Sequence, residues 1–203
     1  MSIFYSVDLD DLHPNPLQQF QLWFAEAKDS RVVMPEAMAL ATAAPGGRPS
    51  ARMVLLKRAD AEGFGFHTNL ESRKGDDLVA NSQAALLFHW QSPGRQVRVE
   101  GWVERMSAEE AGAYFRTRPV GSQLAAWASP QSRPLANRTE LEQKVEEARS
   151  RFPGDEVPLP DHWGGFRLVP ESYEFWQRGA DRLHDCVRYL REGAAWRRER
   201  LAP

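Results

Sequence analysis

The sequence is poor in cysteine, because Cys186 is the only one in 203 residues. A single cysteine cannot form an internal disulfide, which argues against a small disulfide-stapled secreted domain. The first residues, MSIFYSVDLDD, are acidic and lack a basic segment followed by an apolar core. We therefore expect no secretory signal and a cytoplasmic location.

Three other features are also missing. No apolar run approaches the roughly 20 residues that span a bilayer, so we expect no membrane segment. The net charge is −2, whereas a protein that binds nucleic acid usually carries a basic excess, so nucleic acid is not an expected partner. The chain lacks a GxGxxG fingerprint and regular strand–helix alternation, which argues against a Rossmann dinucleotide-binding domain.

What is present is an ordinary globular composition, 42% hydrophobic and 27% charged. We predict one domain over residues 1–203, with a flexible N-terminal segment over residues 1–15. Short apolar runs separated by turn signals such as PGGR and DAEG predict eight or nine strands. We place these strands near 37–43, 49–58, 63–68, 84–90, 96–106, 164–169, 172–177, 185–191 and 196–201.

Helical spacing and capping residues predict three or four helices tucked between the strands, after a first amphipathic helix in LQQFQLWFAEAKD. Ser72 is a candidate cap for SRKGDDLVANS, Ser107 and Glu110 form a capping-box pattern, and Asn137 precedes a polar surface helix. The fold class is thus α+β and mainly β: an antiparallel barrel decorated by helices.

Two basic clusters are candidates for binding phosphate. Arg52 and Lys57 bracket a strand in ARMVLLK, and Arg73 and Lys74 lie in the first turn of a predicted short helix. A helix N-terminus offers free N–H groups and partial positive charge, to which these side chains would add. Arg52 and Lys57 are five residues apart and point to opposite faces of a regular strand. Either a bulge realigns them or they serve two anionic groups. The alternative is that the basic side chains are simply solvated.

A third cluster is in YFRTRPVGSQ, where Tyr114 and Arg118 share a helix face and Ser122 follows a proline. An arginine, a phenol and a hydroxyl would suit a second phosphate. The alternative is that Tyr114 anchors the helix and Arg118 pairs with Glu110 or is solvated.

The chain also contains, in this order, RMVLLK, TNLESRKGDDL, RQVRVEGWVERMS, YFRTRPVGSQLAAWASPQS, VPLPDHWGGFRL, EFWQ, RLHD and RLAP. From about residue 16 to the C-terminus, these stretches resemble the pyridoxamine 5′-phosphate oxidase family. The resemblance implies a homodimeric FMN-binding split barrel with active sites at the subunit interface. It also implies oxidation of pyridoxamine or pyridoxine 5′-phosphate to pyridoxal 5′-phosphate, a step of vitamin B6 metabolism, with O₂ reduced to H₂O₂.

The resemblance assigns residues to each ligand by matching motif. It implies a substrate-phosphate site of Lys57, Tyr114, Arg118 and Ser122. It implies that Arg182 and His184, which share a strand face, contact the substrate ring as catalytic residues, Arg182 by stacking and His184 by orienting the substrate or relaying a proton. The alternative for His184 is a surface histidine paired with Asp185. The implied FMN contacts are Arg52, Met53, Val54, Leu55, Leu56, Lys57, His67, Thr68, Arg73, Lys74, Gln96, Gln131, Ser132 and Trp176.

The sequence departs from the family pattern at Cys186, where relatives usually have an arginine expected near the flavin. A cation there would stabilise negative charge on the reduced ring, which a thiol cannot do. We predict that Arg188, two residues further on the same strand face, reaches toward the flavin edge instead. His67, where a tyrosine is common, is a second departure, and its backbone could be all that matters.

Two other functions remain open. One is a flavin oxidase of the same fold acting on another substrate, such as a phenazine precursor, although the retained phosphate-site residues argue against it. The other is a protein that binds FMN or pyridoxal phosphate without turnover, which Cys186 makes plausible.

Overall fold

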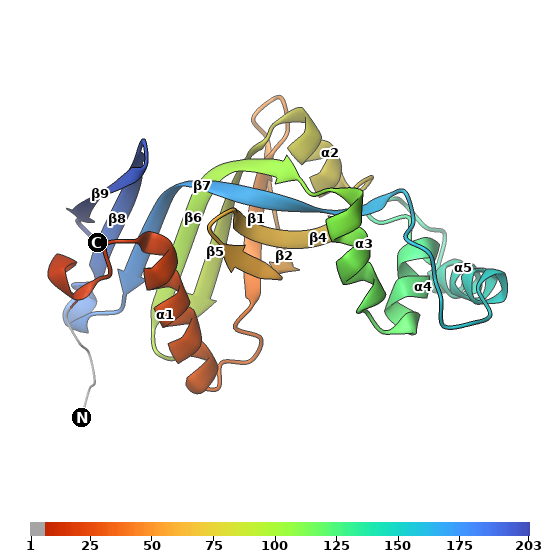
Figure 1. Ribbon diagram of the computed structural model, residues 1–203, viewed down its shortest axis with the longest axis horizontal. Coiled ribbons are helices and arrows are strands. Elements are labelled where there is room, and N and C mark those ends of the chain that lie inside the picture. The colour runs from red at the N-terminus through yellow and green to blue at the C-terminus, as the bar shows by residue number, and fades with distance from the viewer. Residues whose placement is uncertain (1–6) are drawn as a thin grey trace.

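The computed structural model describes residues 7–203, which form five α-helices around one nine-stranded antiparallel sheet (Figure 1). The helices are α1 (Pro16–Asp29), α2 (Arg73–Ala80), α3 (Ala108–Arg116), α4 (Val120–Ala128) and α5 (Arg138–Arg151). The strands are β1 (Ala37–Ala43), β2 (Pro49–Leu55), β3 (Arg58–Asp60), β4 (Gly63–Asn69), β5 (Gln83–Trp90), β6 (Arg95–Arg105), β7 (Trp163–Gln177), β8 (Asp185–Glu192) and β9 (Ala195–Leu201). The predicted antiparallel, mainly β fold is confirmed.

The sheet is built around β7. Its main path is β2-β1-β5-β6-β7-β4-β3, with β8 between β7 and β9. The first part of β7 pairs with β4 and the last part with β8, while β6 pairs along its opposite edge. The predicted site residues on β4 therefore lie beside the start of β7, and those on β8 lie beside its end.

Two predicted strand boundaries were wrong. The strands expected at 164–169 and 172–177 are one strand, because a register shift opposite Pro170 accommodates a residue that has no N–H to donate. The strand expected over 49–58 is divided. The Leu56 N–H donates to Glu36 O beside β1, and the Lys57 N–H donates to Gly65 O in β4. The chain thus changes partner strand at this point, and β2 ends at Leu55.

Local capping signals placed the helices correctly. The Ser72 side chain accepts from the Gly75 N–H at the start of α2, and Ser107 and Glu110 form the predicted capping box of α3. Asn137 caps α5, in which only Ala148 is buried. Residues 7–203 contain five α-helices, which agrees with the predicted first helix followed by four others.

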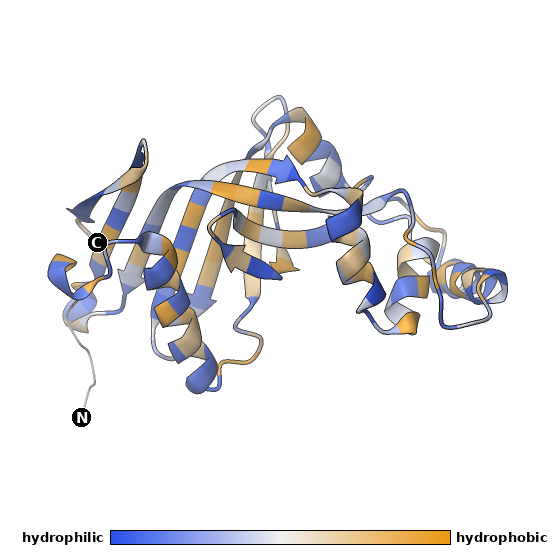
Figure 2. Ribbon diagram, in the orientation of Figure 1, coloured by the Kyte–Doolittle hydropathy of each residue, from blue (hydrophilic) through white to orange (hydrophobic). Residues whose placement is uncertain are grey.

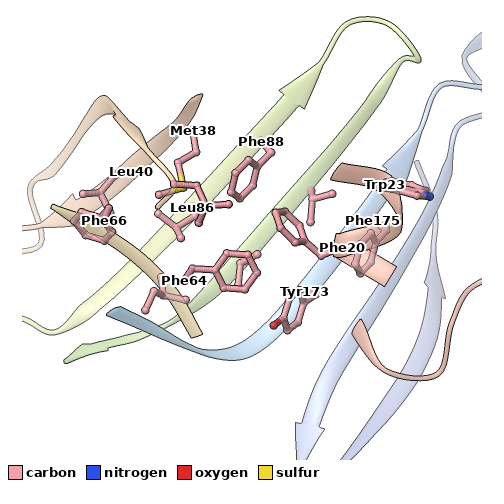
Figure 3. Packing of buried hydrophobic residues seen from close by; sticks show 14 of the residues in the cluster. Phe20, Trp23, Met38, Leu40, Phe64, Phe66, Leu86, Phe88, Tyr173 and Phe175 are labelled. Carbon is pink, nitrogen blue, oxygen red and sulfur yellow. The ribbon is translucent and has the colours of Figure 1, made fainter. Parts of the chain in front are cut away.

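The main core lies between α1 and the concave face of the sheet (Figure 3). Phe20 of α1 is fully buried, with ring-centroid distances of 4.8 Å to Phe64 and 4.9 Å to Phe88. Alternating residues of β6 enter this core, including Val97 and Val99, and Figure 2 shows the corresponding alternation of hydrophilic and hydrophobic residues along the strands. Burying a phenylalanine contributes about 1.5–3 kcal/mol, so these contacts hold α1 on the sheet.

A second, smaller cluster packs α3, α4 and α5 around Phe115 and Trp163. Trp163 begins β7, and Phe166 and Leu168 further along the same strand belong to the main core. β7 therefore contributes to both clusters, and the single domain over residues 1–203 stays a prediction.

The N-terminal residues that the structure describes lie against β8 and β9. The Val7 N–H donates to Asp185, and Arg198 donates to the carbonyl groups of Leu9 and Leu12. The remainder of the segment expected to be flexible, residues 1–6, lies outside the described residues. In the described part of the chain, no helix has the length and apolar character needed to cross a membrane.

Candidate active site

The candidate site is a cavity of about 500 Å³ bordered by β2, β4, α2, α3 and α4. It brings together these predicted residues: Met53, Val54, Leu55, Lys57, His67, Thr68, Lys74, Tyr114, Arg118 and Gln131. Sequence reasoning missed these lining residues: Asn69, Ala125, Ala126, Ser129 and Trp163. Asn69 and Trp163 lie inside the TNLESRKGDDL and VPLPDHWGGFRL stretches, which is the signal that could have found them.

One end of the cavity holds a buried ammonium group. Lys74 is only 8% exposed, and its Nζ donates to Thr68 Oγ1 at 3.0 Å, Ser72 Oγ at 3.1 Å and Gln131 Oε1 at 2.6 Å. All three acceptors are neutral, and Lys74 forms no ion pair within residues 7–203. Burial, reinforced by nearby Arg52, lowers the pKa of Lys74 to about 8. The uncompensated charge favours an anion at this end of the cavity.

Arg52 lies behind this ammonium group rather than in the cavity wall. Its guanidinium donates to Thr42 Oγ1 at 2.8 Å and to Ser50 Oγ at 2.9 Å, and it lies 3.6 Å from Asp77 Oδ2. Burial lowers the pKa of Arg52. Arg73 is exposed on the first turn of α2, and Ser132 adopts a left-handed backbone with φ of 68° just after Gln131. These groups surround the Lys74 end without lining the cavity.

Lys57, Tyr114 and Arg118 form a second basic group in the same cavity. Lys57 Nζ lies 5.5 Å from the centroid of the Tyr114 ring, and Arg118 lies 5.0 Å above the Trp163 ring. Arg118 Nη1 is buried and has no hydrogen-bond partner in the described chain, and burial lowers the pKa of Arg118. A buried donor without an acceptor costs about 1–3 kcal/mol, which a bound anion would relieve.

The alternative pairing of Arg118 with Glu110 is not formed, because the Glu110 carboxylate accepts from the Ser107 N–H and from Arg167 instead. Ser122 lies in α4, one turn before Ala126, and does not line the cavity. Leu56 is 7% exposed and belongs to the main core, so its side chain does not face the cavity as its neighbours do.

The side chain of His67, and not only its backbone, belongs to the cavity wall. Its ring centroid lies 4.3 Å from that of Tyr114 and 5.2 Å from that of Trp163, and the Tyr114 and Trp163 centroids are 6.3 Å apart, so the three nearly parallel rings form one cluster. Burial, with the charges of Lys57 and Arg118, lowers the pKa of His67 to about 4. The imidazole is therefore neutral near pH 7 and adds no charge to the two basic groups.

A second set of predicted residues lies on the outer face of β6, β7 and β8. Gln96 is paired with Trp176, and Trp176 is paired with Cys186. Cys186 is 5% exposed, and burial, with the neighbouring carboxylate of Glu174, raises the pKa of its thiol to about 11. The thiol is therefore un-ionised near pH 7 and is a poor nucleophile.

The next row of this face alternates in charge across four strands: Arg98, Glu174, Arg188 and Glu199 are consecutive partners. Arg188 Nε donates to Glu199 Oε1 at 2.7 Å, and Arg98 Nη2 lies 2.5 Å from Glu174 Oε2. The Arg188 guanidinium is thus bound to a carboxylate of β9, and 39% of its side chain is exposed, so its predicted reach toward the flavin edge stays a prediction.

Arg182 and His184 lie in the loop between β7 and β8. Arg182 is exposed and left-handed, with φ of 65°. The His184 ring lies 4.6 Å from that of Trp176, which joins the loop to the second set. Asp185 is not the partner of His184, because its carboxylate accepts from Val7 and Arg200.

The two sets of residues cannot meet within one chain. His67 pairs with Gly165 near the start of β7, and Trp176 lies near its end. At about 3.3 Å per residue, these positions are separated by roughly 35 Å of strand. Figure 1 shows the same separation, with α3 and α4 at one end of the molecule and β8 and β9 at the other.

The fold and the site together define an antiparallel barrel protein with a cavity lined by two basic groups. Residues 24–152 match the family model described as pyridoxamine 5′-phosphate oxidase. Residues 163–203 match the model described as the pyridoxine 5′-phosphate oxidase C-terminal dimerisation region. The chain belongs to the pyridoxamine 5′-phosphate oxidase family.

Curated relatives agree with this assignment over nearly their whole length. The chain is 54% identical to the pyridoxine/pyridoxamine 5′-phosphate oxidase of Cupriavidus taiwanensis, over 95% of this chain and 91% of that protein. It is also 54% identical to the protein of the same name from Rubrobacter xylanophilus, over 96% of this chain and 89% of that protein.

Two solved structures resemble the chain. PhzG from Burkholderia lata, solved in complex with tetrahydrophenazine-1-carboxylic acid, has a TM-score of 0.92 and 32% identity, with 100% of each chain covered. A pyridoxamine 5′-phosphate oxidase-related, FMN-binding protein from Nostoc punctiforme has a TM-score of 0.74 and 18% identity, covering 95% of this chain and 100% of that one. The second likeness extends to the fold alone.

Proposed function

We propose that the chain is an FMN-dependent oxidase that converts pyridoxamine or pyridoxine 5′-phosphate to pyridoxal 5′-phosphate and reduces O₂ to H₂O₂. The observation that carries this proposal is the presence of two separate basic groups in one cavity, around Lys74 and around Arg118. The substrate and FMN each have one phosphate, so the cavity has a basic group for each. The family and the curated relatives support the same reaction.

The Lys74 group fits the phosphate of FMN. Lys74 is a buried ammonium whose only acceptors within residues 7–203 are neutral oxygens, and Arg52 and Arg73 add positive charge beside it. A phosphate dianion would supply the missing countercharge and accept the hydrogen bonds of these donors. Thr68 and Gln131 orient the ammonium group toward the cavity.

The Arg118 group fits the phosphate of the substrate. The buried Nη1 of Arg118 lacks an acceptor in the described chain, and Lys57 provides a second cation across the Tyr114 ring. The stacked rings of His67 and Trp163 fix the positions of Tyr114 and Arg118. Holding a remote phosphate in this way converts binding energy into orientation of the reacting ring.

The complete site is formed by two subunits of a homodimer. Gln96, Trp176, Arg182 and His184 lie too far along β7 to reach the cavity of their own chain, so they serve the cavity of the partner. The match to a C-terminal dimerisation region over residues 163–203 supports this arrangement. A twofold dimer of this kind contains two equivalent sites.

Bound FMN would accept a hydride equivalent from the substrate carbon that carries the amine or hydroxyl and pass the electrons to O₂. The chain itself positions the reactants. Arg182 covers one face of the pyridine ring by planar stacking, and Trp176 and Gln96 border the flavin. Met53, Val54 and Leu55 provide an apolar wall that excludes water.

At position 186 this chain has a cysteine where relatives usually have an arginine, so the flavin side of the site has one cation fewer. Arg188 remains the predicted replacement for that cation. To reach the flavin edge, its guanidinium would have to break its hydrogen bond to Glu199. The cytoplasmic location, expected from the single cysteine, also stays a prediction.

A turnover assay tests the proposed function directly. With FMN, O₂ and pyridoxamine 5′-phosphate, we expect pyridoxal 5′-phosphate and hydrogen peroxide to appear in a one-to-one ratio. A yellow protein without turnover would contradict catalysis and identify a binding protein. Turnover of a reduced phenazine precursor, but not of the phosphorylated substrates, would favour a PhzG-like oxidase, which the similarity to that structure makes the second candidate.

The affinity for FMN should depend on pH through Lys74. Its pKa of about 8 means that half of the ammonium form is lost at that pH, and a bound phosphate dianion favours the ammonium form. FMN affinity should therefore be nearly constant up to about pH 7, fall by about twofold by pH 8, and then weaken by up to about tenfold per pH unit until the pKa of the complex is reached. Titration by quenching of flavin fluorescence measures this effect.

Lys74→Arg is the control for this titration, because a guanidinium stays charged throughout the range. We expect its FMN affinity to vary much less above pH 8, whatever its absolute value. Equal slopes in the two proteins would show that Lys74 does not titrate at the phosphate.

A further inference from the structure

We infer that the backbone N–H of Gly179 fixes His184 in the tautomer with its proton on Nε2, so that His184 offers the ligand a hydrogen-bond donor and not a proton acceptor. The inference rests on the proposed function, and it assigns Gly179 as a positioning residue.

The direct observation is one hydrogen bond within the loop between β7 and β8. The Gly179 N–H donates to Nδ1 of His184 at 3.2 Å. A neutral imidazole carries one proton, and the nitrogen that accepts a hydrogen bond is the one without it. The proton of neutral His184 is therefore on Nε2.

The tight turn of this loop holds the Gly179 N–H close to the His184 ring. The Leu183 N–H donates to Ala180 O at 2.9 Å, and Asp181 and Arg182 both have left-handed backbones, with φ of 51° and 65°. A Cβ atom at position 179 would lie 1.8 Å from Leu183 O. Only glycine allows this approach, which brings its N–H to Nδ1 of the His184 ring.

Both ends of the loop are held by contacts outside it. At one end, the Arg178 N–H donates to Gly94 O at 2.9 Å. At the other end, Asp185 accepts from the Val7 N–H at 3.0 Å and from Arg200 at 2.7 Å. Because Asp185 is occupied by these donors, it does not compete with Gly179 for the ring of His184.

The consequence concerns the role of His184 in the site. The ring packs on Trp176, and Nδ1 is committed to the loop. The nitrogen left for a ligand is Nε2, which carries a hydrogen and has no free lone pair. His184 can therefore orient an acceptor atom of the substrate ring, but it does not remove a proton from the substrate.

The tautomer can be measured without turnover. We would record two-bond ¹H–¹⁵N correlations on FMN-loaded protein labelled at its five histidines, at pH 8, and assign His184 by comparison with His184→Gln. We expect an unprotonated Nδ1 and a protonated Nε2. A proton on Nδ1, with Nε2 bare or also protonated, would overturn the inference.

Two variants separate the donor from the loop contact. In His184→Gln the side-chain amide nitrogen can take the place of Nε2 and donate, whereas His184→Asn can only replace Nδ1 and accept from Gly179. We expect kcat/KM to fall about tenfold in the glutamine variant and about 100-fold or more in the asparagine variant, since a lost donor leaves a ligand acceptor unpaired.

Equal losses, or the reverse order, would overturn the donor role. Flavin absorbance of each variant shows whether the fold and cofactor site survive. If the wild-type protein lacks turnover of pyridoxamine 5′-phosphate, the proposed function fails, while the tautomer measurement still decides the inference.

Discussion

Replacing Arg118 by methionine should lower kcat/KM for pyridoxamine 5′-phosphate by roughly 100-fold, since a charge-assisted hydrogen bond is worth about 1.5–3 kcal/mol. The physical reason is that the Nη1 atom of Arg118 is buried and has no acceptor within the described residues. A substrate phosphate would supply that acceptor and a countercharge. Initial rates of peroxide formation at low substrate concentration measure the effect.

The same variant should hardly change the slow reaction of pyridoxamine, which lacks the phosphate. Arg116→Met is the matched control, because Arg116 is exposed, two residues away and outside the cavity. A similar loss for both substrates would mean that Arg118 supports the fold of the cavity and does not bind the phosphate. FMN content should be unchanged, because FMN is assigned to the Lys74 group.

Mixed dimers should reveal that each site is shared between two subunits. A dimer of one Arg118→Met chain and one Arg182→Ala chain has one site with both defects and one site with neither. We expect about half of the wild-type activity from this dimer, although each homodimer is nearly inactive. Co-expression with two different tags and tandem purification provides the mixed dimer.

The control is a mixed dimer of a wild-type chain and a chain carrying both substitutions. If sites are shared, each of its two sites receives one defect, and the dimer should be nearly inactive. If each site belongs to one chain, the results are exchanged: the double variant paired with wild type has half activity and the first mixed dimer has almost none.

Much of the fold could be predicted from short-range patterns. Ser72, Ser107 and Asn137 marked helix starts, because a cap depends only on backbone groups two or three residues away. Val97, Val99 and Val103 marked the buried face of β6, because side chains alternate along any strand. The strands predicted at 164–169 and 172–177 are one strand, because the bulge at Glu171 is fixed by the pairing of β7 with distant β6, which no local pattern shows.

The site was predicted less completely, and the missing parts were contacts between distant segments. The parity of Arg52 and Lys57 left open a bulge or two anions. The structure instead ends β2 at Leu55 and places Lys57 beside β4. The cluster of the His67, Tyr114 and Trp163 rings joins three separate segments, so no local pattern predicted it.

The sequence by itself determined which residue types were available: the basic and hydroxyl side chains for two phosphates, and the helix caps and alternating strands that present them. Only the tertiary structure decided that Lys74 is buried without a countercharge in the described chain, and that Trp176 and His67 lie toward opposite ends of β7. Capping and alternation follow from neighbours along the chain, whereas charge burial and the sharing of a site follow from strand pairings between residues far apart in sequence.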